Sequence, residues 1–97
     1  MRVVFSTDAR RDRREAESYY KSVSPALRAA FRADLDAALR YITDYPEGAP
    51  VLLGSTHAKT LVRFPYSVLY KAFNDRIFIV GVANQARDPM RYVDRLT

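Results

Sequence analysis

Residues 64–84 read FPYSVLYKAFNDRIFIVGVAN, two runs rich in β-branched and aromatic residues with the pair Asn74-Asp75 between them. Runs of this composition are typical of β-strands, and we predict strands over 66–73 and 76–84. Asn and Asp tolerate the left-handed backbone conformations that two-residue hairpin turns require. The two strands are therefore expected to be antiparallel neighbours joined by a tight hairpin.

The second of these strands is predicted to lie inside the sheet. The run from Ile77 to Ala83 contains no polar side chain, so both faces of the strand are apolar, as in strands that have a neighbour on either side. Gly81 interrupts the run. A glycine within a strand is expected to mark a bulge or a close approach of another segment.

The N-terminal half is predicted to be mostly helical. A short strand over 2–6 is followed by Asp8, which we interpret as the N-cap of a helix over about 8–21. Ser24-Pro25 is a cap followed by proline at the first helical position. An apolar stripe then predicts a second helix that ends before the breaker Pro46-Glu47-Gly48. The stripe consists of Leu27, Ala30, Phe31, Leu35, Ala38, Leu39, Ile42 and Tyr45.

Two helices joined by so short a turn form an antiparallel hairpin, whose apolar stripes need a surface to cover them. Further short strands are predicted over 51–53 and 59–64. The expected fold class is α+β, with an N-terminal strand and an antiparallel two-helix hairpin packed on a mainly antiparallel, curved sheet. A chain of 97 residues suffices for one such core but not for two, so residues 1–97 are expected to form a single domain.

Composition excludes several classes of site. The chain has no cysteine and one histidine, which removes disulfides, thiolate metal sites, cysteine nucleophiles and multi-histidine metal sites. No cofactor is expected. Apolar residues make up 48% of the chain and charged residues 28%, as in folded proteins. Because no apolar segment approaches the length of a membrane span, we expect a soluble, cytoplasmic protein with no membrane partner.

The chain is basic, with 16 Lys+Arg, 11 Asp+Glu and a formal charge of +5. Residues 1–58 hold nine basic and eight acidic residues, and residues 59–97 hold seven and three, a balance of +1 against +4. The four arginines that open the first helix are matched by four nearby carboxylates, which predicts solvated i,i+4 pairs rather than a nucleic-acid site. These residues are Arg10, Arg11, Arg13, Arg14, Asp8, Asp12, Glu15 and Glu17. An electrostatic function is therefore expected in residues 59–97.

The segment Phe64-Pro65-Tyr66-Ser67-Val68-Leu69-Tyr70, the Asn-Asp hairpin, the strand 77–83 and Arg87-Asp88-Pro89 together resemble the RelE/ParE superfamily of toxins from bacterial type II toxin–antitoxin systems. The order of the expected elements is also similar, so the resemblance covers nearly the whole chain. It implies a plasmid-stabilisation type of toxin in a hetero-oligomer with a cognate antitoxin. Such an antitoxin wraps an extended, often acidic segment around the toxin.

The resemblance implies two alternative modes of action. ParE-like members inhibit DNA gyrase by trapping cleaved DNA, and RelE-like members are ribosome-dependent endoribonucleases that cut mRNA. Sequences of this pattern commonly carry histidine where this chain has Asn84. Because that difference removes a proton-transfer group, and because lysines are sparse, the gyrase-directed mode is preferred. A third hypothesis is a basic module whose only partner is its antitoxin.

RNA cleavage needs a base, an acid and charge stabilisation at the phosphate. Arginine stays protonated, so Lys59 and Tyr92 are the candidate proton-transfer groups in the endoribonuclease alternative, and Arg63 and Arg87 are the candidate phosphate clamps. In the preferred, non-catalytic mode, residues of the same region are expected to bind the target or the antitoxin. This set is Arg63, Arg87, Arg91, Tyr92 and Arg95.

Structural roles compete with some of these assignments. Lys59 also fits a solvated strand residue, and Arg87 also fits an ion pair with Asp88. Tyr66 and Tyr70 lie on one face of their strand and are expected in the core together with Phe64.

Two further expectations concern burial. His57, the single histidine, is expected in an exposed loop. Because the strand 76–84 is apolar on both faces, one face is expected to be covered by the antitoxin or by a second toxin chain rather than by the helices.

Overall fold

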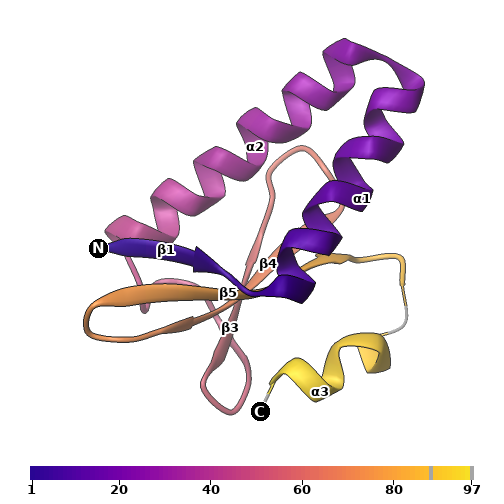
Figure 1. Ribbon diagram of the computed structural model, residues 1–97. Coiled ribbons are helices and arrows are strands. Elements are labelled where there is room, and N and C mark those ends of the chain that lie inside the picture. Colours follow the sequence, from indigo (N-terminus) through magenta and orange to yellow (C-terminus); the bar gives the residue numbers. More distant parts are fainter. Residues whose placement is uncertain (88, 97) are drawn as a thin grey trace.

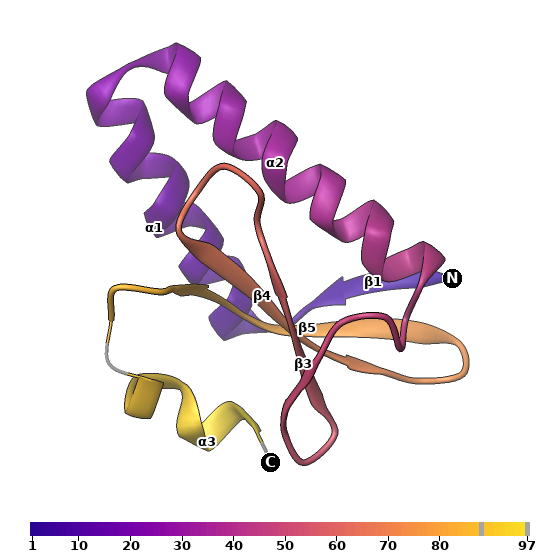
Figure 2. The ribbon, with the colours of Figure 1, turned by 180° about the vertical axis from the view of Figure 1, so that it is seen from behind.

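The computed structural model describes residues 1–87 and 89–96. The α1/α2 hairpin lies on one side of a five-stranded sheet and the short helix α3 on the other (Figures 1 and 2). This confirms the predicted α+β class. The elements are β1 (Arg2–Phe5), α1 (Thr7–Val23), α2 (Pro25–Asp44), β2 (Val51–Leu53), β3 (Thr56–Thr60), β4 (Tyr66–Ala72), β5 (Arg76–Asn84), the 3-10 turn η1 (Pro89–Tyr92) and α3 (Val93–Leu96).

Both long helices begin at a serine cap. The hydroxyl of Ser6 accepts a hydrogen bond from the N–H of Ala9 at 3.0 Å, so the prediction of Asp8 as the N-cap is wrong. Asp8 lies in the first turn instead, where a negative charge interacts favourably with the helix dipole. Ser24 caps α2 in the same way and Pro25 occupies the first turn, as predicted.

The sheet has the strand order β1-β5-β4-β3-β2. β1 pairs with β5 in parallel and the other pairs are antiparallel, so the sheet is mainly antiparallel and β5 has a neighbour on either side, both as predicted. The hairpin between β4 and β5 is confirmed, with the N–H of Phe73 donating to the carbonyl of Arg76 at 2.9 Å. The reason given for its turn was wrong, because no described residue other than glycine has a positive φ.

β5 contains a bulge that shifts by one residue the alternation of side chains between the two faces of the sheet. Leu69 pairs with Gly81 and Tyr70 with Ile79, which leaves Val80 as the extra residue. Ile79 therefore faces the α1/α2 hairpin before the bulge and Val82 does so after it. A Cβ added at Gly81 would lie 3.3 Å from both Arg95 Nη1 and Leu69 Cδ1. The predictions of a bulge and of a close approach at this glycine are both confirmed.

The strand predicted over 59–64 is displaced to Thr56–Thr60. The buried carboxylate of Asp34 in α2 accepts hydrogen bonds from the N–H groups of Val62, Arg63 and Phe64, at 3.3, 2.8 and 3.0 Å. These three amides are therefore hydrogen-bonded to a helix and not to a neighbouring strand, so the pairing of β3 with β4 ends at Thr60.

The main core fills the space between the α1/α2 hairpin and the sheet. Phe31 and Ile42 of α2 are fully buried in it, and so is Tyr70 of β4. Phe64 and Tyr66 belong to the same cluster, which confirms the prediction that these aromatic residues pack in the core.

A second, smaller apolar cluster covers the opposite face of the sheet. Leu69, Val80 and Ala83 pack there against Tyr92 and Leu96 of the C-terminal segment. We expected the antitoxin or a second toxin chain to cover one face of β5. For these residues that expectation was wrong, because η1 and α3 of the same chain cover them.

His57 is also placed differently from the prediction. It lies in β3, is 6% exposed, and its Nδ1 is 2.8 Å from the carbonyl oxygen of Ala49. Its ring stacks on that of Tyr70, with 5.0 Å between the ring centres.

No helix within the described part of the chain is long and apolar enough to cross a membrane.

Candidate functional site

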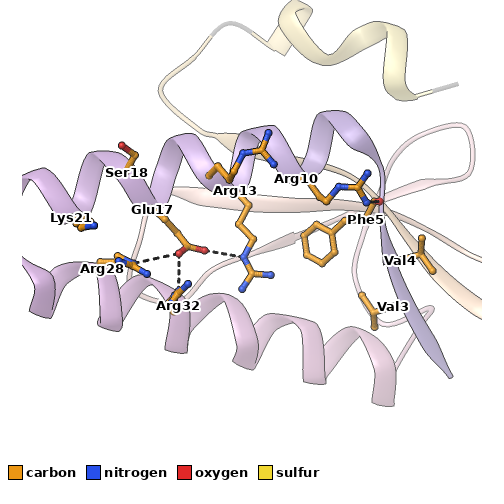
Figure 3. Close-up of a pocket in the computed structure, with 11 residues that line it drawn as sticks. Val3, Val4, Phe5, Arg10, Arg13, Glu17, Ser18, Lys21, Arg28 and Arg32 are labelled. Carbon is orange, nitrogen blue, oxygen red and sulfur yellow. Dashed lines mark hydrogen bonds and ion pairs between the residues drawn. The ribbon is translucent and has the colours of Figure 1, made fainter.

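A cleft of about 830 Å³ opens between α1 and α2 and ends at β1 (Figure 3). β1 contributes the apolar side chains Val3, Val4 and Phe5, and α1 contributes a single carboxylate, Glu17. The remaining charged residues that line it are Arg10, Arg13, Arg14, Lys21, Arg28 and Arg32.

The cleft concentrates the charge of the whole chain. Six cations and one carboxylate give it a formal charge of +5, which equals the +5 of the full sequence. The remaining ten basic and ten acidic residues balance each other over the rest of the molecule. The count along the sequence, +1 for residues 1–58 and +4 for residues 59–97, does not reveal this concentration, because it arises where α1 and α2 bring residues distant in sequence together.

The two faces of α1 explain how the surplus arises. Asp8, Asp12 and Glu15 follow the i, i+4, i+7 spacing of one helical face, and these carboxylates pair with the C-terminal segment. Asp12 Oδ2 is 2.6 Å from Arg95 Nη1, and Glu15 Oε2 is 4.0 Å from an amino group of Arg87. Most of the carboxylates that were expected to neutralise the arginines of α1 therefore point away from the cleft.

Only part of the predicted pairing within α1 is present. Arg11 lies 3.5 Å from Asp8, and Arg13 Nε lies 2.9 Å from Glu17 at the i,i+4 spacing. Arg14 has no hydrogen bond or ion pair to any described residue, and neither has Lys21, one helical turn before the hairpin loop. These two exposed charges remain available at the cleft.

Glu17 is the meeting point of three arginines, as Figure 3 shows. Its carboxylate oxygens lie 2.9 Å from Arg13 Nε, 2.7 Å from Arg32 Nε and 3.6 Å from Arg28 Nε, and its side chain is 13% exposed. Burial alone would raise the pKa of Glu17, but the hydrogen bonds from Arg13 and Arg32 and the charges of both arginines outweigh it, so the pKa lies below its ordinary value. One negative charge held by three positive ones leaves donors for a further anion.

This arrangement can bind anions but offers little for catalysis. The lining residues include no histidine, and the one carboxylate is ionised and occupied by arginines. Within residues 1–87 and 89–96, no three acidic, histidine or cysteine side chains are placed to hold a metal ion.

The residues predicted as a site in the C-terminal part come together only in part, because Arg87 and Tyr92 line the same groove whereas Lys59 lies elsewhere. Lys59 Nζ lies 4.5 Å from the centre of the Tyr41 ring, on the helix-covered face of the sheet. Tyr92 is 5% exposed and packs in the apolar cluster on the opposite face. The two candidate proton-transfer groups are thus separated by the sheet.

The predicted arginines have different roles from one another. Arg95 is held by Asp12 and its guanidinium lies 5.0 Å from the centre of the Tyr92 ring, so it fastens α3 to the body of the protein. Arg87, together with Tyr92, lines a mostly apolar groove of about 430 Å³ beside β2. The side chains of Arg63 and Arg91 are exposed and make no contact with that groove. The alternative ion pair between Arg87 and Asp88 falls outside the described residues.

Asn84, the position at which similar sequences carry histidine, ends β5. Its Oδ1 accepts the N–H of Ala86 at 2.9 Å, and its carbonyl oxygen accepts that of Arg87 at 3.1 Å. The side chain therefore shapes the turn that leaves the strand.

The cleft was not predicted from the sequence, although a signal for it exists. The basic residues of α1 recur at the spacing of one helical face, and Arg28 and Arg32 follow at i,i+4 on α2. Because two helices in a hairpin are antiparallel neighbours, the two rows face a common space. Counting charges along the chain conceals this pattern.

Comparison with known proteins identifies the fold. No protein-family model and no curated protein sequence matches the chain. Among solved structures, a chain of the chromosomal ParDE TA (toxin–antitoxin) system from P. aeruginosa matches with a TM-score of 0.69 and 19% sequence identity, covering 87% of this chain and 95% of that chain. This protein therefore has the fold of that ParDE chain, in agreement with the RelE/ParE resemblance of its sequence.

Proposed function

We propose that this protein is the toxin of a type II toxin–antitoxin system, that it inhibits DNA gyrase by trapping the cleaved DNA complex, and that a cognate antitoxin holds it inactive. The observation that carries the proposal is the fold shared with a chain of a ParDE system, which extends over 87% of this chain. The sequence motifs from Phe64 to Tyr70 and after Asn84 point to the same superfamily.

The positions of the candidate catalytic residues support a binding mode over RNA cleavage. An endoribonuclease needs a base and an acid on either side of one phosphate. Here Lys59 and Tyr92 lie on opposite faces of the sheet, and Tyr92 is buried. Asn84 supplies a turn-forming carboxamide where a histidine would supply a proton-transfer group.

The test compares two purified targets. The protein is incubated with gyrase and supercoiled plasmid, and separately with ribosomes programmed with messenger RNA. The proposal expects gyrase-dependent plasmid cleavage and intact message. Codon-specific cuts in the message would overturn it in favour of the ribosome-dependent endoribonuclease, and in that case Lys59→Ala and Arg87→Ala should slow the cutting much more than they weaken ribosome binding.

Expression in growing bacteria completes the test. The proposal expects growth inhibition that is relieved when the cognate antitoxin is expressed with the protein. Unimpaired growth in the absence of any antitoxin would instead favour a basic module whose only partner is its antitoxin.

A further inference from the structure

The cleft between α1 and α2 combines three properties that together define a kind of partner. It carries a surplus of five positive charges, it has an apolar end at β1, and β1 is an edge strand that pairs with β5 alone. We propose that this cleft binds an extended segment of a partner protein in which acidic and apolar residues alternate. The inference rests on the proposed function, because it assigns a docking place to the acidic segment of the antitoxin.

Charge complementarity is the first argument. Glu17 shows how a carboxylate binds in the cleft, because Arg13 and Arg32 donate hydrogen bonds to it at 2.9 and 2.7 Å. Arg14 and Lys21 line the same cleft with no hydrogen bond or ion pair to a described residue. Carboxylates of a partner would find unoccupied arginine and lysine donors there, which are the strongest kind of hydrogen-bond donor for an anion.

The spacing of the cations suits an extended peptide. Arg10 and Arg14 are one helical turn apart on α1, and Arg28 and Arg32 are one turn apart on α2, which places each pair about 6 Å apart along the helix axis. In an extended chain the side chains on one side recur every second residue, about 6.6 Å apart. Alternate acidic residues can therefore follow the rows of cations in register.

The length of the cleft wall sets the length of the segment. α1 has 17 residues and is thus about 26 Å long. An extended chain advances about 3.3 Å per residue, so about eight residues cover the wall from the hairpin loop to β1.

The end of the cleft favours a peptide over a nucleic acid. Val3 and Phe5 of β1 are half-buried apolar residues at this end, and the unpaired edge of β1 can accept a further strand. A single-stranded nucleic acid would instead need several aromatic platforms for its bases, and Phe5 is the one aromatic side chain that lines the cleft. Part of the strand edge is already engaged, because Arg10 donates to the carbonyl of Phe5 at 3.0 Å.

The test measures binding of defined probes by fluorescence anisotropy. The main probe is a labelled peptide of about eight residues that alternates glutamate and valine. One control peptide replaces each glutamate by lysine, and a short oligodeoxythymidine of matched charge is the nucleic-acid control. We expect the acidic peptide to bind the full chain more tightly than either control, with an affinity that falls as salt is added.

Two matched double variants locate the binding. Arg28→Gln/Arg32→Gln removes two charges from the cleft, and Arg63→Gln/Arg91→Gln removes two exposed charges outside it. The first is expected to weaken peptide binding about tenfold and the second less than about twofold. Thermal unfolding checks that each variant is folded. Should the first pair fail to fold, the exposed, unpaired residues Arg14→Gln and Lys21→Gln replace it with the same expectation.

Several outcomes would overturn the inference. Equal losses in the two double variants would show that the peptide is held by net charge alone, and tighter binding of the oligonucleotide through the same arginines would make the cleft a phosphate site. The gyrase assay is independent of these measurements. Peptide binding that depends on the cleft, without gyrase inhibition, would refute only the proposed function. An antitoxin that neutralises the protein equally well after the cleft arginines are replaced would refute only the docking place.

Discussion

The cleft between α1 and α2 and the C-terminal segment that follows β5 both contain arginines, but they use them in opposite ways. In the C-terminal segment, Arg95 is paired with Asp12, and Arg87 lies 4.0 Å from Glu15. In the cleft, three arginines share the single carboxylate of Glu17. An arginine that has carboxylates of its own, as Arg95 has in Asp12 and Asp8, serves to hold a segment in place. A carboxylate that three arginines share leaves positive charge for a ligand.

The comparison shows why charge counted along a sequence is a poor guide to a binding surface. Asp12 and Glu17 are five residues apart on the same helix, yet their carboxylates point to different sides of it. What decides the local potential is the helical face on which each charge lies, and which chain segment that face meets.

The largest effect is expected at the C-terminal segment, from Asp12→Ala. Asp12 accepts the N–H of Val82 at 3.0 Å and holds the four-fifths buried side chain of Arg95. Removing it leaves the N–H of Val82 without its acceptor and leaves the largely buried charge of Arg95 with only the longer contacts to Asp8 at 3.7 Å and to the carbonyl of Val80 at 3.4 Å. The free energy of unfolding should therefore fall by about 2 kcal/mol. Urea denaturation measures this loss.

Glu15→Ala is the matched control for that variant. It lies on the same face of α1, but its side chain is about half exposed and its contact with Arg87 is 4.0 Å long, so a loss below about 0.5 kcal/mol is expected. Equal losses in the two variants would contradict the view that Asp12 fastens the C-terminal segment.

Glu17→Gln in the cleft is expected to lower stability by less than Asp12→Ala does, and to strengthen peptide binding. The three arginines around it then repel one another without a neutralising charge, which should lower the free energy of unfolding by about 1 kcal/mol at low salt and by less at high salt. The same variant should bind the acidic peptide more tightly. Asp36→Asn, at an exposed position of α2 outside the cleft, is the control and should change neither quantity. Weaker peptide binding by Glu17→Gln would count against the cleft as an anion site.

The pH dependence of stability should isolate the contribution of Glu17. Its pKa in the folded protein lies below the ordinary value of 4.5, so its stabilising contribution is fully present above that value and is lost as pH falls through the lowered pKa. The difference in unfolding free energy between the wild type and Glu17→Gln should therefore shrink below about pH 4.5. Urea denaturation from neutral pH down to about pH 3 measures it. A difference that is constant across this range would show that the carboxylate charge plays no part.

The elements that were predicted well depend on local patterns. The caps and stripe of α2, the hairpin at Asn74-Asp75 and the apolar run of β5 each lie within a single segment, and each is present in the structure. The fold class followed from them because an amphipathic hairpin has to cover one face of a sheet.

The features that were missed depend on contacts between distant segments. His57 is buried because its partners are the carbonyl of Ala49 and the ring of Tyr70, neither of which a local pattern reveals. The strand predicted over 59–64 ends early because Asp34, about thirty residues away, binds the amides that a ladder would have used. The cleft belongs to the same class, since its two rows of cations come from different helices.

The smallest effect on stability is expected from a pair of single variants, one in the cleft and one outside it, that should differ in peptide binding but not in stability. Arg14 lies at the cleft and Arg63 outside it, both side chains are exposed, and neither forms an ion pair or side-chain hydrogen bond with a described residue. Arg14→Glu and Arg63→Glu should each change the free energy of unfolding by less than about 0.5 kcal/mol. They make the same change in net charge, so any difference in peptide affinity reports position and not charge. Arg14→Glu should weaken binding of the acidic peptide several-fold, whereas Arg63→Glu should leave it within about twofold, as anisotropy titrations at low salt can establish. If Arg63→Glu had the larger effect, the docking surface would lie beside the loop that Asp34 holds and not between the helices.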